Sequence, residues 1–84
     1  MKRNFVMFTK KACPYCKRAV DKMEKEEHDY EIVQLDKNPN SLKMIKNLYG
    51  WETVPIILEY HSDERQTFVG GYTDLLEYFE EKND

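Results

Sequence analysis

Apolar positions along the chain fall into short runs and helical repeats that predict seven elements. Four short runs rich in β-branched and aromatic residues, at 5–8, 30–35, 55–60 and 65–69, predict strands. Three stretches, at 14–27, 42–49 and 73–79, repeat apolar residues at helical spacing and predict helices. Pro14 suits the first turn of a helix, Gly50 stops the second helix, and Thr73 or Asp74 is placed to cap the third. The predicted order is β-α-β-α-β-β-α.

This order of elements predicts an α/β fold. A strand, a helix and a second strand in succession favour a parallel pair with a right-handed crossover, and the later hairpin adds an antiparallel pair. We therefore expect a mixed four-stranded sheet with helices on both faces. The chain shows no linker and no internal repeat, so we expect one domain over residues 1–84. The apolar residues that mark the second helix are Leu42, Ile45, Leu48 and Tyr49, and the third helix is expected to place Leu75, Leu76 and Phe79 in the core.

Composition narrows the class of protein. A chain of 84 residues with 40% hydrophobic and 13% aromatic residues suits one small packed domain. The 13 basic and 16 acidic residues give a net charge of −3, which argues against a general nucleic-acid-binding protein. The apolar run at 5–8 is too short for a signal peptide, and no run approaches the length of a membrane span. We expect a cytoplasmic monomer with no membrane partner.

The two cysteines of the chain lie in one motif, Cys13-Pro14-Tyr15-Cys16, between a predicted strand and a predicted helix. A disulfide across two residues closes too small a loop to stabilise the fold much, so the pair indicates chemistry. A cysteine at a helix start faces unpaired N–H groups and the positive end of the helix dipole, and both favour the thiolate. Cys16 lies on the same side of the first turn, within disulfide reach. We predict thiol–disulfide exchange, with Cys13 as nucleophile and Cys16 as resolving thiol, and a Cys13 pKa below the free value of about 8.5.

Zinc binding is the main structural alternative for these cysteines. The other candidate ligands are His28 and His61, whose separation of 33 residues fits no typical pair of zinc ligands. We expect both histidines to be exposed surface residues rather than ligands or catalytic bases. Trp51 is equally compatible with core packing and with a partner-facing position. Gly70-Gly71 is not a nucleotide-binding fingerprint, because no G-x-G-x-x-G follows a strand.

Three motifs in order give the chain a family resemblance. With Cys13-Pro14-Tyr15-Cys16, Thr53-Val54-Pro55 and Gly70-Gly71-Tyr72-Thr73-Asp74, it resembles the dithiol glutaredoxins of the thioredoxin-like fold. The resemblance implies an enzyme, a glutathione-dependent oxidoreductase that reduces protein disulfides and glutathione mixed disulfides. It implies glutathione as the reducing co-substrate, no tightly bound cofactor, and proteins such as ribonucleotide reductase as partners.

The resemblance also implies a glutathione groove beside Cys13. In it, Pro55 follows a cis peptide bond, the backbone of Val54 pairs with the cysteinyl part of glutathione, and Lys10 binds the glycine carboxylate. A carboxylate held at a helix N-terminus, as implied for the γ-glutamyl end, is physically reasonable. The residues that would line this groove are Lys10, Tyr15, Thr53, Val54, Pro55, Gly71, Tyr72, Thr73 and Asp74.

Two positions depart from the family pattern. Ile56 stands where many relatives have a polar residue, and Glu52 stands where some have a basic residue. A second cationic contact to glutathione would then come from Lys11, Lys43 or Lys46. Two alternative functions follow: a thioredoxin-like electron donor fed by a flavoprotein reductase, and a module that binds glutathione or an iron–sulfur cluster.

Overall fold

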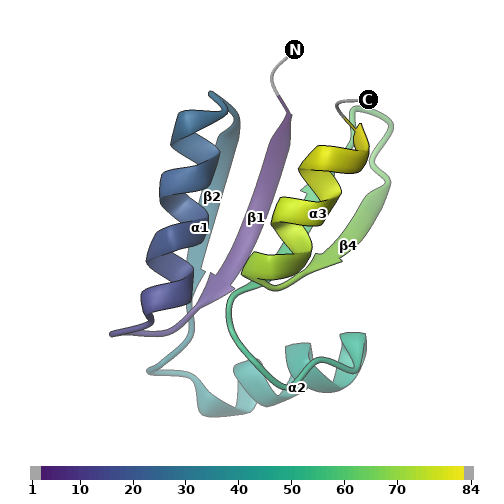
Figure 1. The fold of residues 1–84 in the computed structure, drawn as a ribbon. Coiled ribbons are helices and arrows are strands. Elements are labelled where there is room, and N and C mark those ends of the chain that lie inside the picture. The colour runs from purple at the N-terminus through teal and green to yellow at the C-terminus, as the bar shows by residue number, and fades with distance from the viewer. Residues whose placement is uncertain (1–2, 83–84) are drawn as a thin grey trace.

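The computed structural model describes residues 3–82 and confirms the predicted order of elements (Figure 1). Residues 1–2 and 83–84 of the predicted domain lie outside the described residues. None of the helices within 3–82 combines the length and the apolar character that crossing a membrane requires. The strands are β1 (Asn4–Thr9), β2 (Asp29–Gln34), β3 (Ile56–Tyr60) and β4 (Gln66–Gly70), and the helices are α1 (Pro14–Lys25), α2 (Pro39–Tyr49) and α3 (Tyr72–Lys82).

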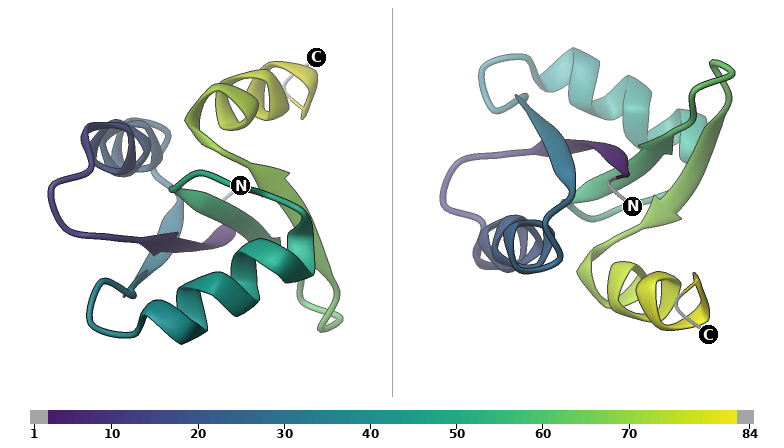
Figure 2. Two further views of the ribbon diagram at one scale, coloured as in Figure 1. Left: turned by 90° about the horizontal axis from the view of Figure 1, so that it is seen from below. Right: turned by 90° about the horizontal axis from the view of Figure 1, so that it is seen from above.

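The four strands form one mixed sheet in the order β2-β1-β3-β4. β1 pairs with β2 in parallel and with β3 in antiparallel, and β3 pairs with β4 in antiparallel. Helices α1 and α3 lie side by side on one face of the sheet, and α2 crosses the other face (Figures 1 and 2). The expected α/β fold, with a parallel pair, a hairpin and helices on both faces, is confirmed.

The core lies between the sheet and the pair α1 and α3. β1 and β3 are the two central strands and are buried along most of their length, whereas the outer strand β2 is largely exposed. Near-continuous burial is expected for central strands that are covered on both faces. The core cluster consists of Phe5, Met7, Ala19, Met23, Ile57, Leu75 and Phe79.

The second helix is confirmed and is largely exposed. Helix α2 has no fully buried residue, and Leu48, one of the apolar residues that mark it, is 71% exposed. Leu42, Ile45 and Tyr49 are half-buried. Periodicity shows which residues share a face of the helix, but it does not show how much of that face a neighbouring element covers. Leu76 of α3 is likewise half-buried rather than a full core residue.

Both histidines are half-buried, so the prediction of exposed surface residues is wrong. His28 packs against the rings of Phe5 and Phe79, with centroids 5.7 and 5.2 Å away, and its Nδ1 accepts a hydrogen bond from the Arg3 N–H. Burial, followed by the charge of Arg3, lowers the pKa of the His28 ring. His61 is in hydrogen-bond contact with Thr67 Oγ1, at 2.7 Å across the β3–β4 hairpin.

A buried carboxylate on β3 ties the residue directly before β1 to α3. Glu59 of β3 is 5% exposed and receives two hydrogen bonds from the Arg3 guanidinium, at 2.7 and 2.6 Å, and one from the Tyr78 hydroxyl. The guanidinium also lies 4.9 Å from the centre of the Tyr78 ring. Burial alone would raise the pKa of Glu59, but the hydrogen bonds from Arg3 and Tyr78 outweigh it and lower that pKa.

Candidate active site

The two cysteines lie at the N-terminus of α1, as predicted. Cys13 is the N-cap residue, Pro14 occupies the first helical turn, and the Cys16 N–H donates a hydrogen bond to the Cys13 sulfur at 3.2 Å. The pair forms a disulfide in the structure, with Cα atoms 5.2 Å apart. Cys16 is 6% exposed, whereas Cys13 is half-buried. The accessible sulfur is therefore the one that faces the helix N-terminus and receives an N–H, which is the geometry that stabilises a thiolate.

The loop before β3 reaches the reactive sulfur. The Val54 carbonyl oxygen lies 3.9 Å from Cys13 Sγ, although the two residues are 41 positions apart in sequence. The Val54–Pro55 peptide bond is cis, as the resemblance implied. Pro55 is fully buried behind this contact. The backbone of Val54 thus stands beside the sulfur that attacks.

A groove of about 280 Å³ lies on the β3 and α3 side of Cys13; it is not lined by Cys13 itself but by Val54, whose carbonyl oxygen approaches the Cys13 sulfur. Its walls include the rings of Tyr15 and Tyr72, whose centroids are 6.2 Å apart, and the Arg18 guanidinium lies 5.2 Å from the Tyr15 ring centre. Eight of the nine residues predicted to bind glutathione come together here. The groove is lined by Tyr15, Trp51, Thr53, Val54, Pro55, Gly71, Tyr72, Thr73 and Asp74.

The far end of the groove is closed by the start of α3. Asp74 Oδ2 accepts a hydrogen bond from the Gly71 N–H at 3.0 Å, and the Gly71 carbonyl accepts the first helical bond from Leu75. Gly71 is thus the N-cap of α3, and neither Thr73 nor Asp74 occupies that position, contrary to the prediction. The Asp74 carboxylate still lines the groove. It lies three positions after the N-cap, where its negative charge interacts favourably with the helix dipole.

The predicted cationic residues lie elsewhere. Lys10 does not line the groove but a second hollow on the opposite, β2 side of the disulfide. Lys11 lines that second hollow too, and Lys43 and Lys46 belong to α2, so none of the three alternative cations lines the groove. Ala12, directly before Cys13, has a left-handed backbone with φ of 57°, which turns the loop at this point.

Trp51 is a groove residue that sequence reasoning left undecided. Its ring packs edge-on against Phe68, with centroids 5.4 Å apart, and the residue also lines the groove. The indole Nε1 is buried and has no hydrogen-bond partner within residues 3–82. A buried donor without a partner is rare and needs an explanation. The signal in the sequence is the position of Trp51 two residues before the Thr53-Val54-Pro55 motif.

The two departures from the family pattern have different settings. Ile56 is fully buried, opposite Phe8 in the β1–β3 register, so its apolar side chain serves packing. Glu52 is exposed and does not line the groove. Neither side chain therefore contributes a charge to the groove.

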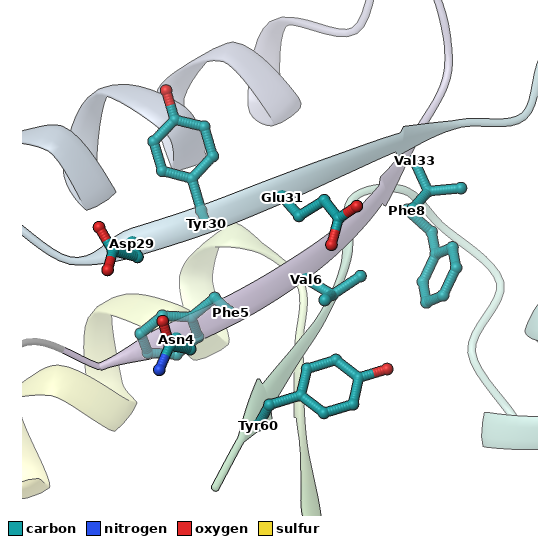
Figure 3. Close-up of a pocket in the computed structure, with 9 residues that line it drawn as sticks. All are labelled: Asn4, Phe5, Val6, Phe8, Asp29, Tyr30, Glu31, Val33 and Tyr60. Carbon is teal, nitrogen blue, oxygen red and sulfur yellow. The ribbon is translucent and has the colours of Figure 1, made fainter. Parts of the chain in front are cut away.

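A larger hollow of about 580 Å³ lies away from the cysteines, over β1 and β2 (Figure 3). Figure 3 shows Val6, Glu31 and Tyr60 on one face of the sheet, with Tyr30 pointing to a helix on the other. Neither cysteine lines this hollow. Among the described residues, no group of three or more His, Cys, Asp or Glu is placed to hold a metal ion. The redox chemistry therefore belongs to the cysteine pair, and the groove on the β3 and α3 side comes close to Cys13 through Val54, whose carbonyl oxygen lies 3.9 Å from Cys13 Sγ.

Comparison with known proteins identifies the family of the chain. Residues 5–58 match the family model described as Glutaredoxin. The structure is similar to that of glutaredoxin 1 from Francisella tularensis complexed with cacodylate, with a TM-score of 0.74, 22% identity and 94% of each chain covered.

Two further solved structures share the fold. The buckwheat glutaredoxin–glutathione complex has a TM-score of 0.75 and 20% identity over 95% of this chain and 71% of that one. Glutaredoxin from Brucella melitensis has a TM-score of 0.69 and 19% identity over 93% and 79%. A comparison with curated protein sequences finds no match. With the family model covering well over half of its residues, the chain belongs to the glutaredoxin family, its fold is thioredoxin-like, and Cys13 and Cys16 are its redox-active pair.

Proposed function

We propose that this thiol–disulfide oxidoreductase uses glutathione as its reductant and acts on glutathione mixed disulfides and protein disulfides. One observation carries the proposal: the groove beside Cys13 gathers eight of the nine residues that the resemblance assigns to glutathione. These residues come from α1, the loop before β3 and the start of α3. The solved complex of buckwheat glutaredoxin with glutathione, which shares this fold, supports the same ligand class.

In the monothiol route, the Cys13 thiolate attacks the glutathione sulfur of a mixed disulfide. The Cys13–glutathione disulfide forms, and the substrate thiolate leaves and takes up a proton. A second glutathione thiolate then attacks the glutathione sulfur attached to Cys13. Glutathione disulfide forms, and the Cys13 thiolate leaves. The Cys16 N–H stabilises that thiolate, as the 3.2 Å contact to the Cys13 sulfur indicates, and this makes Cys13 a better leaving group.

In the dithiol route, Cys13 attacks a disulfide of a protein substrate, and one substrate sulfur leaves as a thiolate. Cys16 then attacks Cys13, and the second substrate sulfur leaves, so the substrate gains two electrons and the pair becomes oxidised. The structure holds this oxidised form. Two glutathione molecules return the pair to the dithiol. Low exposure of Cys16 suits a thiol that reacts within the protein only.

Glutathione itself would lie along the groove. The Val54 backbone, next to Cys13 Sγ, would pair with the cysteinyl part, and the start of α3 would hold the γ-glutamyl carboxylate. Lys10, on the other side of the disulfide, would reach the glycine carboxylate only across the loop that carries Cys13. The cytoplasmic location and the monomeric state remain parts of this proposal.

A coupled turnover assay tests the proposal. A glutathione mixed disulfide, glutathione, glutathione reductase and NADPH are incubated with the intact protein, Cys13→Ser or Cys16→Ser. We expect turnover that disappears in Cys13→Ser and survives in Cys16→Ser. Appreciable turnover in Cys13→Ser, or equal loss in both variants, would contradict the monothiol mechanism.

A second arm distinguishes the source of electrons. In one reaction, cysteinylglycine, which lacks the γ-glutamyl group, replaces glutathione at equal concentration. In another reaction, a flavoprotein disulfide reductase with NADPH replaces the thiol reductant. We expect glutathione to be much the best reductant, because only glutathione has the carboxylate that the start of α3 would hold. Equal rates with the two thiols, or faster reduction through the flavoprotein, would remove glutathione from the proposal.

A further inference from the structure

A second hollow lies against the same disulfide, on the side opposite the glutathione groove. Its volume is about 360 Å³, and both Cys13 and Cys16 line it. The glutathione groove lies toward β3 and α3, whereas this hollow lies between the start of α1 and the outer strand β2. Figure 1 shows β2 and the start of α1 at one side of the sheet and β4 and α3 at the other. A disulfide substrate at Cys13 therefore meets two separate surfaces.

The hollow has an apolar floor. Ile32 of β2 is 46% exposed, one of the few large apolar side chains with this much exposure, and Val20 of α1 is half-buried beside it. In the β1–β2 register Ile32 lies opposite the fully buried Met7, so both belong to the face that α1 covers. Helix α1 leaves Ile32 partly uncovered at the edge of the sheet. An apolar side chain of a partner would remove this surface from water.

The rim of the hollow is positively charged. Three of its residues are lysines, Lys10, Lys11 and Lys17, and none is acidic. This is the reverse of the whole chain, whose net charge is −3. An adjoining hollow, which shares Lys11 and Gln34, adds one charge of each sign, Asp36 and Lys37. The excess of positive charge is thus concentrated next to the reactive sulfur.

We propose that this β2-side hollow binds the residues next to the reactive cysteine of a protein substrate, and that it selects an acidic residue accompanied by an apolar one. The proposal rests on the thiol–disulfide exchange described above. The Cys13 thiolate attacks the substrate sulfur, a Cys13–substrate disulfide forms, and the partner sulfur of the substrate leaves as a thiolate. During this intermediate the substrate chain lies over Ile32 and among the lysines, until Cys16 attacks Cys13 and releases the reduced substrate.

Single-turnover reduction of cyclic peptide disulfides, without glutathione, tests this inference separately from the glutathione proposal. Three peptides share one sequence, which contains a Leu in all of them. They differ only in the residue next to one cysteine, which is Glu, Gln or Lys. Each rate is divided by the rate with dithiothreitol, which corrects for the intrinsic reactivity of each peptide. We expect the pre-reduced protein to favour the Glu peptide over the Lys peptide by about tenfold at low salt, and less at high salt.

Charge-reversal variants locate the preference. Lys11→Glu and Lys17→Glu should each reduce the Glu-over-Lys ratio to about threefold or less, which is the effect of losing one exposed charge pair. Lys25→Glu, on the last turn of the same helix, is the matched control and should keep the ratio. The ratio is the readout because a change in Cys13 reactivity affects both peptides equally.

Ile32→Ser tests the apolar floor. This variant should slow reduction of the peptide with Leu relative to the same peptide with Ala, and leave turnover of a small neutral disulfide unchanged. The proposal is overturned if the intact protein reduces the Glu and Lys peptides equally, or if Lys11→Glu and Lys17→Glu keep the same ratio as Lys25→Glu. It is also overturned if no peptide is reduced while the small disulfide is; loss of both activities would instead overturn the oxidoreductase function.

Discussion

Gly70 and Gly71 stand next to each other where β4 ends and α3 begins, yet the structure predicts a much larger loss of stability for a methyl group at Gly70 than for one at Gly71. Gly70 has φ of +116°, a region that L residues rarely adopt. A Cβ at Gly70 would lie 2.9 Å from Cβ, Cγ and Oδ2 of Asp74. At Gly71 it would lie 3.7 Å from its three nearest atoms, which are Asp74 Oδ2, the Pro55 carbonyl oxygen and Trp51 Nε1.

The cost of Gly70→Ala follows from these numbers. The backbone conformation costs about 1–3 kcal/mol, and displacing Asp74 weakens its hydrogen bond to the Gly71 N–H, worth about 1 kcal/mol. Alanine also lowers the conformational entropy of the unfolded chain, which offsets about 0.4–1 kcal/mol of this cost. We expect a net loss of about 2 kcal/mol, which lowers Tm by roughly 8–16 °C for a domain of this size.

Gly71→Ala should behave differently. Its Cβ makes ordinary contacts, so we expect a loss of less than about 1 kcal/mol, mainly because alanine is a poorer N-cap than glycine. The three atoms around the methyl group all belong to residues that line the groove on the β3 and α3 side of Cys13. Under the proposal that glutathione binds in this groove, a methyl group on its wall should raise the KM for glutathione several-fold.

Thermal unfolding of the oxidised proteins, followed by circular dichroism, tests the difference. Gly50→Ala is the control for backbone conformation alone, because Gly50 has φ of +61° with no atom within 4 Å of an added Cβ. We expect Tm to fall most in Gly70→Ala, less in Gly50→Ala and least in Gly71→Ala. A Gly70→Ala protein that melts like the parent, or a Gly71→Ala protein that melts as low as Gly70→Ala, would refute the reasoning.

Three further predictions concern the buried carboxylate, the buried histidine and the tryptophan. Arg3→Met leaves the Glu59 carboxylate buried without its cation, so urea unfolding should show a free energy of unfolding lower by about 3 kcal/mol. The double variant Arg3→Met/Glu59→Met should recover much of this loss, and an Arg3→Met protein as stable as the parent would contradict a stabilising ion pair. The pKa of His28 is lowered in the folded protein, so the unfolded state binds the proton more readily. The contribution of His28 to the free energy of unfolding is therefore full above about pH 6.5 and should decline as the pH falls below that value. Urea unfolding at about pH 7 and 5 should show that His28→Leu reduces this decline, and an unchanged decline would exclude His28 as a cause. Trp51→Phe should keep the fold but raise the KM for glutathione, because Trp51 lines the groove and its buried indole N–H has no partner within residues 3–82; an unchanged KM would show that this donor makes no contact with the ligand.

Local signals explain why the redox pair was predictable. The motif is placed at a helix N-terminus by three signals that lie within about a dozen residues of one another. They are the strand before Cys13, Pro14 at the first helical turn, and the spacing to Cys16. The order of elements likewise follows from periodicity and from the turn residues. Most groove residues were found through the family resemblance alone, since Thr53-Val54-Pro55 and the start of α3 meet Cys13 only in the folded chain.

The features that the sequence did not predict depend on tertiary placement. Leu48 satisfies the helical pattern of α2 but is 71% exposed, so the elements within residues 3–82 leave most of this side chain uncovered. Lys10 is close to Cys13 in sequence, yet the loop with the left-handed Ala12 brings it to the β2 side of the disulfide. Trp51 lines the groove because the chain turns back at Gly50, and hydrophobicity alone does not distinguish this from core packing.

The most direct test of the central claim, that Cys13 is the activated nucleophile and Cys16 the resolving thiol, is alkylation of the reduced protein across a range of pH. A limiting amount of iodoacetamide is added, and mass spectrometry of the digested protein quantifies the product at each cysteine. The account predicts that Cys13 reacts first and reaches half its maximal rate well below the free-thiol pKa of about 8.5, while the buried Cys16 reacts slowly. Equal or faster alkylation of Cys16, or a Cys13 that reacts like a free thiol, would contradict it.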